Sequence, residues 1–479
     1  MDELAQTLGQ AATGAFTALC LVLVAGFLTL VMIPRLHTPV RAWLRPHAIH
    51  HVESGLDLVL AAQRWQSPWL TQLFTKSSHS VSVTFYASFL PMLFWLGLPE
   101  LGRDLVCLMA LALYVGNAIK DLVCSPRPLS VSYGKQRLKF LGASDEEVEL
   151  NAKEYGLPSS HTLNTLCLNY MIVWYLYDRQ LIAAGTAAIL YCLVALWVMW
   201  IAASRLYLGL HTPIDILAGA VAGLAVLVCF IAIEGHLSRW VLAGPQAVVH
   251  AAAASLVLLR LHPRPLAHTP SYEFTTSFMG SMFGVVAGLA ELWSGRDRLL
   301  AGSRLLWAAR RLGVGFVVVG AFKEGSRAVL LAALPLLYRF FPLPVRRLWQ
   351  PPVHNLAKAP PQQQQQQQQH RKGKNSQQEE EQDGFLQQQD GKLAAAAAAR
   401  QRRRSLRGGA APAAEGLAAA GAAAEEAAAS PVDPRLAELP HNAQGLPWDV
   451  DVTSRFFAYS AIGVAVAGVV PRILEALDW

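Results

Sequence analysis

The sequence predicts an all-α protein that crosses a membrane several times. Hydrophobic residues make up 53% of the 479 residues and charged residues only 15%, whereas a soluble domain carries about 25% charged residues. The mean hydropathy is +0.31. Nine or ten stretches are apolar over nearly the length, roughly 20 residues, that a helix needs to span a bilayer. This composition excludes a disordered chain, a disulfide scaffold and most soluble enzymes.

The candidate spans begin close to the N-terminus. Residues 12–33 follow Asp2 and Glu3 with no preceding Lys or Arg, and the apolar run is too long for a signal peptide, so we interpret it as an anchor helix. Residues 35–82 are mixed in character and predict a helix on or near the membrane. The other candidate spans are 84–98, 105–119, 162–177, 181–203, 214–233, 240–259, 274–292, 314–337 and 456–474.

One of these spans carries charges. Lys323, Glu324 and Arg327 lie inside 314–337, and charged side chains are costly within a bilayer. They indicate either an ion pair or helix break, or a role in a transport pathway. We favour the first of these interpretations.

A low-complexity segment separates the last two spans. It contains eight consecutive glutamines at 362–369, alanine-rich runs and a basic run at 400–407, and it lacks the apolar content needed to fold alone. We expect five regions: an N-terminal anchor and interfacial segment (1–83), a core with three motifs (84–235), further membrane helices (236–345), a disordered insert (346–448) and a C-terminal membrane helix (449–479).

Charge and cysteine content argue against other partner classes. The net charge of +7 does not indicate binding to nucleic acid, because much of the basic excess lies in the insert and in short loops. The six cysteines include no C-x-x-C pair, which argues against a zinc site or a redox motif. We expect no cofactor.

Three short motifs place polar side chains beside apolar helices. The first is KDLVCSPRP at 120–128, the second is PSSH at 158–161, and the third is SRLYLGLHTPID at 204–215. Successive membrane helices run in opposite directions. The first motif follows the span 105–119, the second precedes 162–177, and the third lies between 181–203 and 214–233. All three therefore lie at the same membrane face. We expect the three motifs to meet there and to bind an anionic partner, since buried cations need one.

The residue types in these motifs suit phosphate chemistry. Basic side chains neutralise a tetrahedral oxyanion, and Arg adds bidentate contacts. Two serines at a helix N-terminus offer free backbone N–H groups, and two histidines are candidates for nucleophile and general acid. The candidate phosphate-binding residues are Lys120, Arg127, Ser159, Ser160 and Arg205, and the candidate catalytic residues are His161, His211 and Asp215.

Asp215 has two interpretations. It lies four residues after His211, a spacing that lets it hold one imidazole nitrogen and leave the other free to attack. With Thr212 and Pro213 it also forms the N-cap, N1 and N3 pattern of a helix start. From the sequence alone both interpretations stay open.

Taken together, the motifs resemble the three-part signature of the type 2 phosphatidic acid phosphatase superfamily, which also includes vanadium haloperoxidases. Further stretches, among them FTKSSHSVSVTFYASFLPMLFW, EYGLPSSHTLNT and HTPSYEFTTSFMG, resemble plant and algal long-chain base 1-phosphate phosphatases, which are relatives of animal sphingosine-1-phosphate phosphatases. The resemblance covers roughly 57–292. The broad superfamily usually has glycine where Ser160 stands, and the branch acting on sphingoid bases has Ser or Thr there.

The resemblance implies a phosphatidic acid phosphatase/haloperoxidase-like helical bundle and a metal-independent hydrolysis in two steps. In this scheme His211 attacks phosphorus and forms a phosphohistidine, Asp215 orients His211, and His161 protonates the leaving alkoxide and then activates water. The candidate phosphate-binding residues named above hold the phosphate oxygens. The implied substrate is a membrane lipid, a phosphorylated long-chain (sphingoid) base, and the implied location is the endoplasmic reticulum membrane.

Three alternative functions stay open. A phosphatidate or isoprenoid-diphosphate phosphatase would use the same residues on another headgroup. A lipid phosphotransferase would pass the phosphate from the histidine to a second lipid. A non-catalytic lipid-binding or transport protein would keep the motifs as a relic, and the charges inside 314–337 motivate that alternative.

The loops on the motif face do not decide which side of the membrane this face lies on, or whether a loop controls entry to the site. Their basic residues place this face in the cytosol by the positive-inside rule, whereas the resemblance implies the lumen, which we favour. These basic residues are Arg35, Arg41, Arg45, Lys135, Arg137 and Lys139. The acidic loop 129–157 is either a gate or a solvated loop, and we favour the solvated loop.

Overall fold

The computed structural model describes residues 2–131, 138–144, 148, 154–267, 269–292, 304–340 and 448–477. The chain divides into one unit of 1–354 with 439–479 and a second unit of 355–438. The second unit, and nearly all of the expected insert at 346–448, lie outside the described residues. Everything below concerns the first unit.

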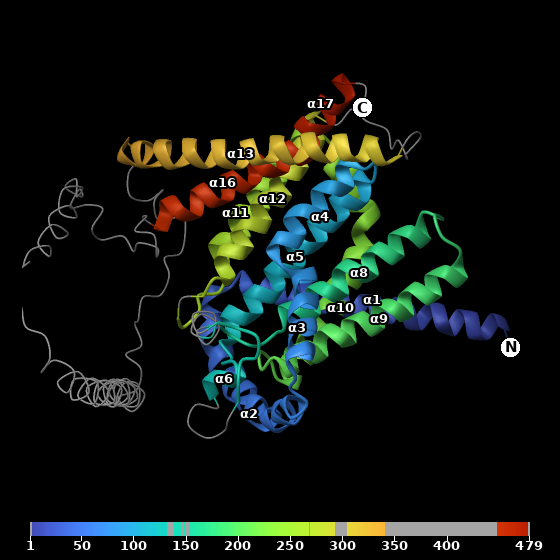
Figure 1. The fold of residues 1–479 in the computed structure, drawn as a ribbon, viewed down its shortest axis with the longest axis vertical. Coiled ribbons are helices and arrows are strands. Elements are labelled where there is room, and N and C mark those ends of the chain that lie inside the picture. Colours follow the sequence, from blue (N-terminus) through green and yellow to red (C-terminus); the bar gives the residue numbers. More distant parts are fainter. Residues whose placement is uncertain are drawn as a thin grey trace, which may run out of the picture. The chain divides into compact units, whose positions relative to one another are not determined.

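The regular elements of the described residues are all helices (Figure 1). In chain order, the first are α1 (Asp2–Val31), α2 (His37–Gln63), α3 (Pro68–Ser78), α4 (Val83–Trp95), α5 (Pro99–Val123), α6 (Pro128–Val131), α8 (Ser160–Asp178) and α9 (Ala184–Tyr207). They are followed by α10 (Pro213–Val241), α11 (Pro245–Leu261), α12 (Ser271–Leu292), α13 (Arg304–Phe340), α16 (Trp448–Val464), the π-helical turn η3 (Ala465–Val469) and α17 (Val470–Ala476). The predicted all-α fold class is confirmed.

Five helical stretches in the described part of the chain are long and apolar enough to cross a membrane. They are Gln10–Val31, Pro99–Val123, Ala184–Tyr207, Pro213–Val241 and Asp449–Ala476. The apolar side chains of α1 and α9 are mostly exposed, whereas α5 is almost entirely buried. In a membrane, α1 and α9 therefore face lipid, and α5 is the central helix.

The central helix α5 contacts α8, α10 and α12, and Figure 1 shows it running among them. Large side chains fill the space between these helices. The largest fully buried ones are Trp95, Tyr114, Phe230 and Phe456. The last of these belongs to α16, so the C-terminal helix is part of the same core, against α12 and α13.

Several helices begin at the signals that physical chemistry predicts. The hydroxyls of Ser67 and Ser82 accept hydrogen bonds from the backbone N–H groups of Leu70 (3.3 Å) and Phe85 (3.1 Å), which caps α3 and α4. Proline stands at the first position of α3, α5, α10 and α11, where its missing N–H costs nothing.

Two expected spans and the expected interfacial segment differ in detail from the observed helices. The segment 35–82 forms two helices, α2 and α3, instead of one interfacial helix. The expected span 240–259 is split, because α10 ends at Val241 and α11 begins at Pro245 after Gly244, whose φ is +81°. The expected span 314–337 lies inside the longer α13.

The charges of α13 form the expected ion pair without breaking the helix. Lys323 Nζ lies 3.6 Å from Glu324 Oε1, and both side chains are more than half exposed. α13 is not among the five stretches apolar enough to span a membrane.

Candidate active site

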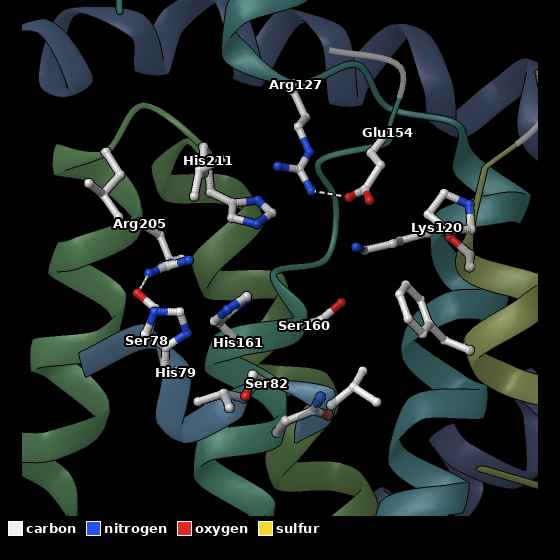
Figure 2. A pocket seen from close by; sticks show the side chains of 18 of the residues that line it. Ser78, His79, Ser82, Lys120, Arg127, Glu154, Ser160, His161, Arg205 and His211 are labelled. Carbon is white, nitrogen blue, oxygen red and sulfur yellow. Dashed lines mark hydrogen bonds and ion pairs between the residues drawn. The ribbon is translucent and has the colours of Figure 1, made fainter. Parts of the chain in front are cut away.

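A cavity of about 400 Å³ opens among α5, α8, α9 and the loop before α10. Six of the eight candidate residues line it: Lys120, Arg127, Ser160, His161, Arg205 and His211. Figure 2 shows their polar ends pointing into one shared space. The three motifs thus meet at a single cavity, as the alternating direction of the helices predicts.

The first motif is held in place by α2. At the end of α5, Cys124 adopts a left-handed conformation with φ of 54°, and this turns the chain toward Arg127. Arg41 donates hydrogen bonds to the carbonyls of Leu122 (2.8 Å) and Asp121 (2.9 Å), and Arg45 donates to the carbonyl of Cys124 (3.1 Å). These guanidinium groups satisfy carbonyls that the end of a helix leaves without partners.

The side chains of the first motif lie inside the molecule. Lys120, in the last turn of α5, and Arg127, after the turn, are each 7% exposed. Such buried cations require anionic partners. Glu154 supplies one to Arg127, and an anion bound in the cavity would be a further one.

The second motif opens α8, and its two serines have different environments. The hydroxyl of Ser159 is the N-cap and accepts hydrogen bonds from the backbone N–H (3.5 Å) and the hydroxyl (3.1 Å) of Thr162. Its own N–H donates to the carbonyl of Asp215 (2.8 Å). Ser159 is fully buried and does not line the cavity, whereas Ser160 and His161, in the first turn, do.

The third motif joins α9 to α10. Arg205 donates from Nε to Ser204 Oγ (3.1 Å) and from Nη2 to Ser78 Oγ, and the second bond is drawn in Figure 2. His211 is 2% exposed, and its Nδ1 lies 3.6 Å from Asp215 Oδ2. The third motif therefore contributes Arg205 from the end of α9 and His211 from just before α10.

Asp215 combines the two interpretations that the sequence left open. Its Oδ2 accepts hydrogen bonds from the backbone N–H (2.8 Å) and hydroxyl (3.0 Å) of Thr212, which caps α10. The same oxygen faces the imidazole of His211. Asp215 is fully buried and lies behind His211, outside the cavity lining.

Electrostatics keep the imidazole of His211 neutral and the carboxylate of Glu154 ionised. Burial, assisted by the charges of Arg127 and Lys120, lowers the pKa of His211 to about 4. For Glu154, burial would raise the pKa, but the charges of Arg127 and Lys120 outweigh it and lower the pKa below its usual range. At neutral pH His211 is therefore an unprotonated imidazole and Glu154 an anion.

The cavity has lining residues that the motif analysis did not select. Among them are Glu154, which forms an ion pair with Arg127, and Ser78 and His79 at the end of α3. Glu154 directly precedes the YGLPSSHT stretch, and this position next to the second motif could have identified it as a candidate residue. The acidic residues 145–147 and 149 of the same loop lie outside the described residues. Within the described part of the chain, no three His, Cys, Asp or Glu side chains are grouped to hold a metal ion.

Comparison with known proteins places this cavity in a family context. Residues 101–238, which contain all three motifs, match the PAP2 superfamily. The chain is 36% identical over 255 residues to lipid phosphate phosphatase delta from Arabidopsis thaliana, covering 53% of this chain and 60% of that protein. It is 28% identical over 262 residues to the Saccharomyces cerevisiae dihydrosphingosine 1-phosphate phosphatase YSR3, covering 52% and 60%.

Two further comparisons are more distant. Human sphingosine-1-phosphate phosphatase 2 is 26% identical over 223 residues, covering 45% of this chain and 51% of that protein. A solved transmembrane PAP2-type phosphatidylglycerolphosphate phosphatase from Bacillus subtilis covers 43% of this chain and 93% of its own, with 18% identity and a TM-score of 0.32. The chain thus spans about three fifths or less of the length of these three curated relatives.

Proposed function

We propose that this chain, whose residues 101–238 match the PAP2 superfamily, is a membrane lipid phosphatase that hydrolyses long-chain base 1-phosphates to the free base and phosphate. One observation carries this proposal: a single cavity gathers three cations and the two motif histidines at the end of a bundle of apolar helices. The relatives named as a lipid phosphate phosphatase and a dihydrosphingosine 1-phosphate phosphatase support the substrate class.

The remaining wall of the cavity suits a lipid chain. Apolar side chains from α4, α5 and α12 line it, namely Val83, Tyr86, Leu113, Phe274 and Phe278. A phosphate bound among the cations therefore has an apolar surface next to it, which is favourable for a hydrocarbon chain. This arrangement favours a phosphorylated lipid over a soluble phosphate ester.

In the first step His211 is the nucleophile. The negative charge of Asp215, whose Oδ2 lies 3.6 Å from Nδ1, favours the tautomer in which Nδ1 carries the proton and Nε2 has the free electron pair. Burial and the neighbouring cations lower the pKa of His161, so His161 takes up a proton when a bound phosphate dianion offsets those cations. Nε2 attacks phosphorus, the P–O ester bond breaks, and the protonated His161 gives its proton to the leaving alkoxide. Lys120, Arg127 and Arg205 neutralise the charge that develops on the phosphate oxygens.

In the second step water replaces the histidine. His161, now unprotonated, takes a proton from a water molecule, whose oxygen attacks phosphorus. The P–N bond to His211 breaks, and inorganic phosphate leaves. Ser160 contributes its hydroxyl and backbone N–H at the start of α8, while Ser159 acts on the phosphate only through the helix start that it caps. The scheme needs no metal ion.

The proposed location is the endoplasmic reticulum membrane, with the cavity on the lumenal side. The basic loop residues argued for a cytosolic face by simple counting. Two of them, Arg41 and Arg45, donate hydrogen bonds to the carbonyls at the end of α5. Because they serve as helix caps, they are weaker indicators of orientation than free loop charges.

The test is phosphate release from a long-chain base 1-phosphate by membranes containing the full chain, with EDTA present. We expect release in the wild type and a loss of roughly 10³-fold or more in His211→Ala. Release from phosphatidate or an isoprenoid diphosphate, but not from the long-chain base phosphate, would replace the substrate class. Equal release by wild type and His211→Ala would refute the assigned nucleophile.

A further inference from the structure

Glu154 lines the cavity but has no part in the hydrolysis proposed above. Its carboxylate forms an ion pair with Arg127, and its side chain is 27% exposed. Figure 2 shows the Glu154 carboxylate directed to the side of the cavity where Lys120 and Arg127 also point. An anion is thus placed among the cations that would bind the phosphate.

The position of Glu154 is fixed by the residues that follow it. Tyr155 pairs with Pro126 of the first motif, and the N–H of Gly156 donates to the carbonyl of Ser125 (2.9 Å). The hydroxyl of Tyr155 accepts a hydrogen bond from the backbone N–H of Ala267 (2.9 Å). The backbone next to Glu154 is therefore tied to the first motif and to the segment before α12.

Gly156 ties the same segment to the third motif. A Cβ at this position would lie only 3.1 Å from Asp215 Oδ2 and 3.2 Å from the carbonyl oxygen of Pro126. The chain passes between two motifs at a distance that only glycine allows without displacement. Glu154 is consequently held at the cavity by the contacts of the two residues that follow it, and not by its ion pair alone.

A carboxylate in this place has an electrostatic consequence. A phosphate dianion bound by Lys120 and Arg127 is repelled by Glu154, so an ordinary phosphate monoester binds less well than it would without this residue. The effect of Glu154 on binding becomes favourable for a substrate that carries its own cation close to the phosphate. In a long-chain base 1-phosphate, an ammonium group stands on the carbon next to the one that carries the phosphate ester, whereas phosphatidate has no such group.

We propose that Glu154 is a specificity-determining residue whose carboxylate binds the ammonium group of long-chain base 1-phosphates and disfavours lipid phosphates that lack it. The inference rests on the proposed function, since it names the group that selects among lipid phosphates. Glu154 pairs with Arg127 in the structure. With substrate bound, the guanidinium turns to the phosphate, and the carboxylate contacts the ammonium beside it.

The test compares two substrates that differ only at the amine: dihydrosphingosine 1-phosphate and its N-acetylated derivative, which has the same chain and phosphate but no charge on nitrogen. We expect the full-length wild type to show a kcat/KM roughly 10- to 100-fold higher for the free amine, as expected for a lost charge pair in a partly buried site. Glu154→Gln should remove most of this preference by lowering the value for the free amine. The value for the N-acetylated substrate should stay equal or rise.

Other patterns would overturn the proposal. Equal kcat/KM of the wild type for both substrates would do so without any variant. An equal fall for both in Glu154→Gln would show that Glu154 only orients Arg127, and an equal rise would show that it only occupies the empty phosphate site. Glu154→Asp is the matched control and should keep a preference for the free amine. Wild type that hydrolyses phosphatidate but neither sphingoid substrate would instead refute the proposed function.

Discussion

His211 and Asp215 show how the local sequence prepares a nucleophile. Their i, i+4 spacing crosses the start of α10, so one carboxylate oxygen both caps the helix and faces the imidazole. Burial lowers the pKa of His211 to about 4, and Arg127 and Lys120 act in the same direction, whereas Asp215 acts against them. Because the shift is downward, the imidazole is unprotonated above this pKa and becomes protonated only as the pH falls through it.

We predict that His211 of the substrate-free protein stays neutral at pH 5.5. The measurement is a pH titration of the imidazole ¹⁵N resonances of the full-length protein in detergent, with His211→Asn to assign the signal. A short model peptide containing one histidine is the reference, since a free imidazole titrates near the usual pKa of about 6.5. A midpoint near 6.5 for His211 as well would contradict the burial of the imidazole in this site.

At the residue scale the sequence predicted the motif side chains better than their neighbours. Side-chain chemistry and spacing identified the six motif residues that line the cavity. They did not separate Ser159, whose hydroxyl caps α8, from Ser160, which lines the cavity, because both suit a helix start. Glu154 was missed because one carboxylate at the end of an acidic loop looks like a solvated charge until the fold places it beside Arg127.

At the scale of elements, α12 and the C-terminal helix approach each other backbone to backbone. A Cβ built on Gly284 of α12 would lie 2.0 Å from the carbonyl oxygen of Ser460, and one on Gly280 would lie 2.4 Å from that of Phe456. On the opposing helix, a Cβ on Gly463 would lie 2.5 Å from the carbonyl oxygen of Ser281. Close approach through small residues is a common way for membrane helices to associate.

We therefore predict that Gly284→Ala destabilises the protein by about 1–3 kcal/mol, because the added methyl group forces the two backbones apart. The measurement is thermal unfolding of the full-length protein in detergent. Gly320→Ala is the matched control, since a Cβ there meets nothing within 4 Å, and it should be neutral or slightly stabilising. Equal melting temperatures for Gly284→Ala and wild type would contradict this packing.

Helix existence was predictable from apolar stretches, and helix ends were not. Hydropathy places 105–119 in a span, but α5 continues to Val123, because the guanidinium groups of α2 satisfy the carbonyls of its last turn. Likewise, apolar residues run past Trp240, whereas the turn at Gly244 and Pro245 ends one helix and begins the next. The ends depend on caps contributed by distant segments, which a local window does not contain.

At the scale of the whole molecule, a second polar cluster ties the bundle together far from the cavity. Arg103, near the start of α5, contacts Asp104 Oδ1 (2.8 Å), Ser238 Oγ (2.6 Å) and Glu234 Oε1 (3.6 Å). Arg103 is 4% exposed. Seventeen residues of helix separate it from Lys120, a rise of roughly 25 Å. The cluster thus joins α5 to α10 at the end of the bundle away from the cavity.

We predict that Arg103→Met lowers the free energy of unfolding by about 3–5 kcal/mol, because it leaves the buried carboxylate of Asp104 without its cation. The activity per folded molecule should not change, given the distance from the cavity. Arg179→Met is the control: Arg179 also contacts Glu234, but it is 39% exposed, so its loss should cost about 0–1 kcal/mol. Unfolding in urea, paired with phosphate release per folded molecule, measures both quantities. A loss of activity without a loss of stability would contradict this assignment.

The central claim is that His211 carries the phosphate between the two steps. The most direct measurement uses a ³²P-labelled long-chain base 1-phosphate, turnover by the full-length protein, a rapid alkaline quench, and mass spectrometry of the peptide that contains His211. The account predicts a phosphate on His211 that survives alkali, is lost in acid, and is absent from His211→Asn together with activity. Label on a different residue, or turnover retained by His211→Asn, would contradict it.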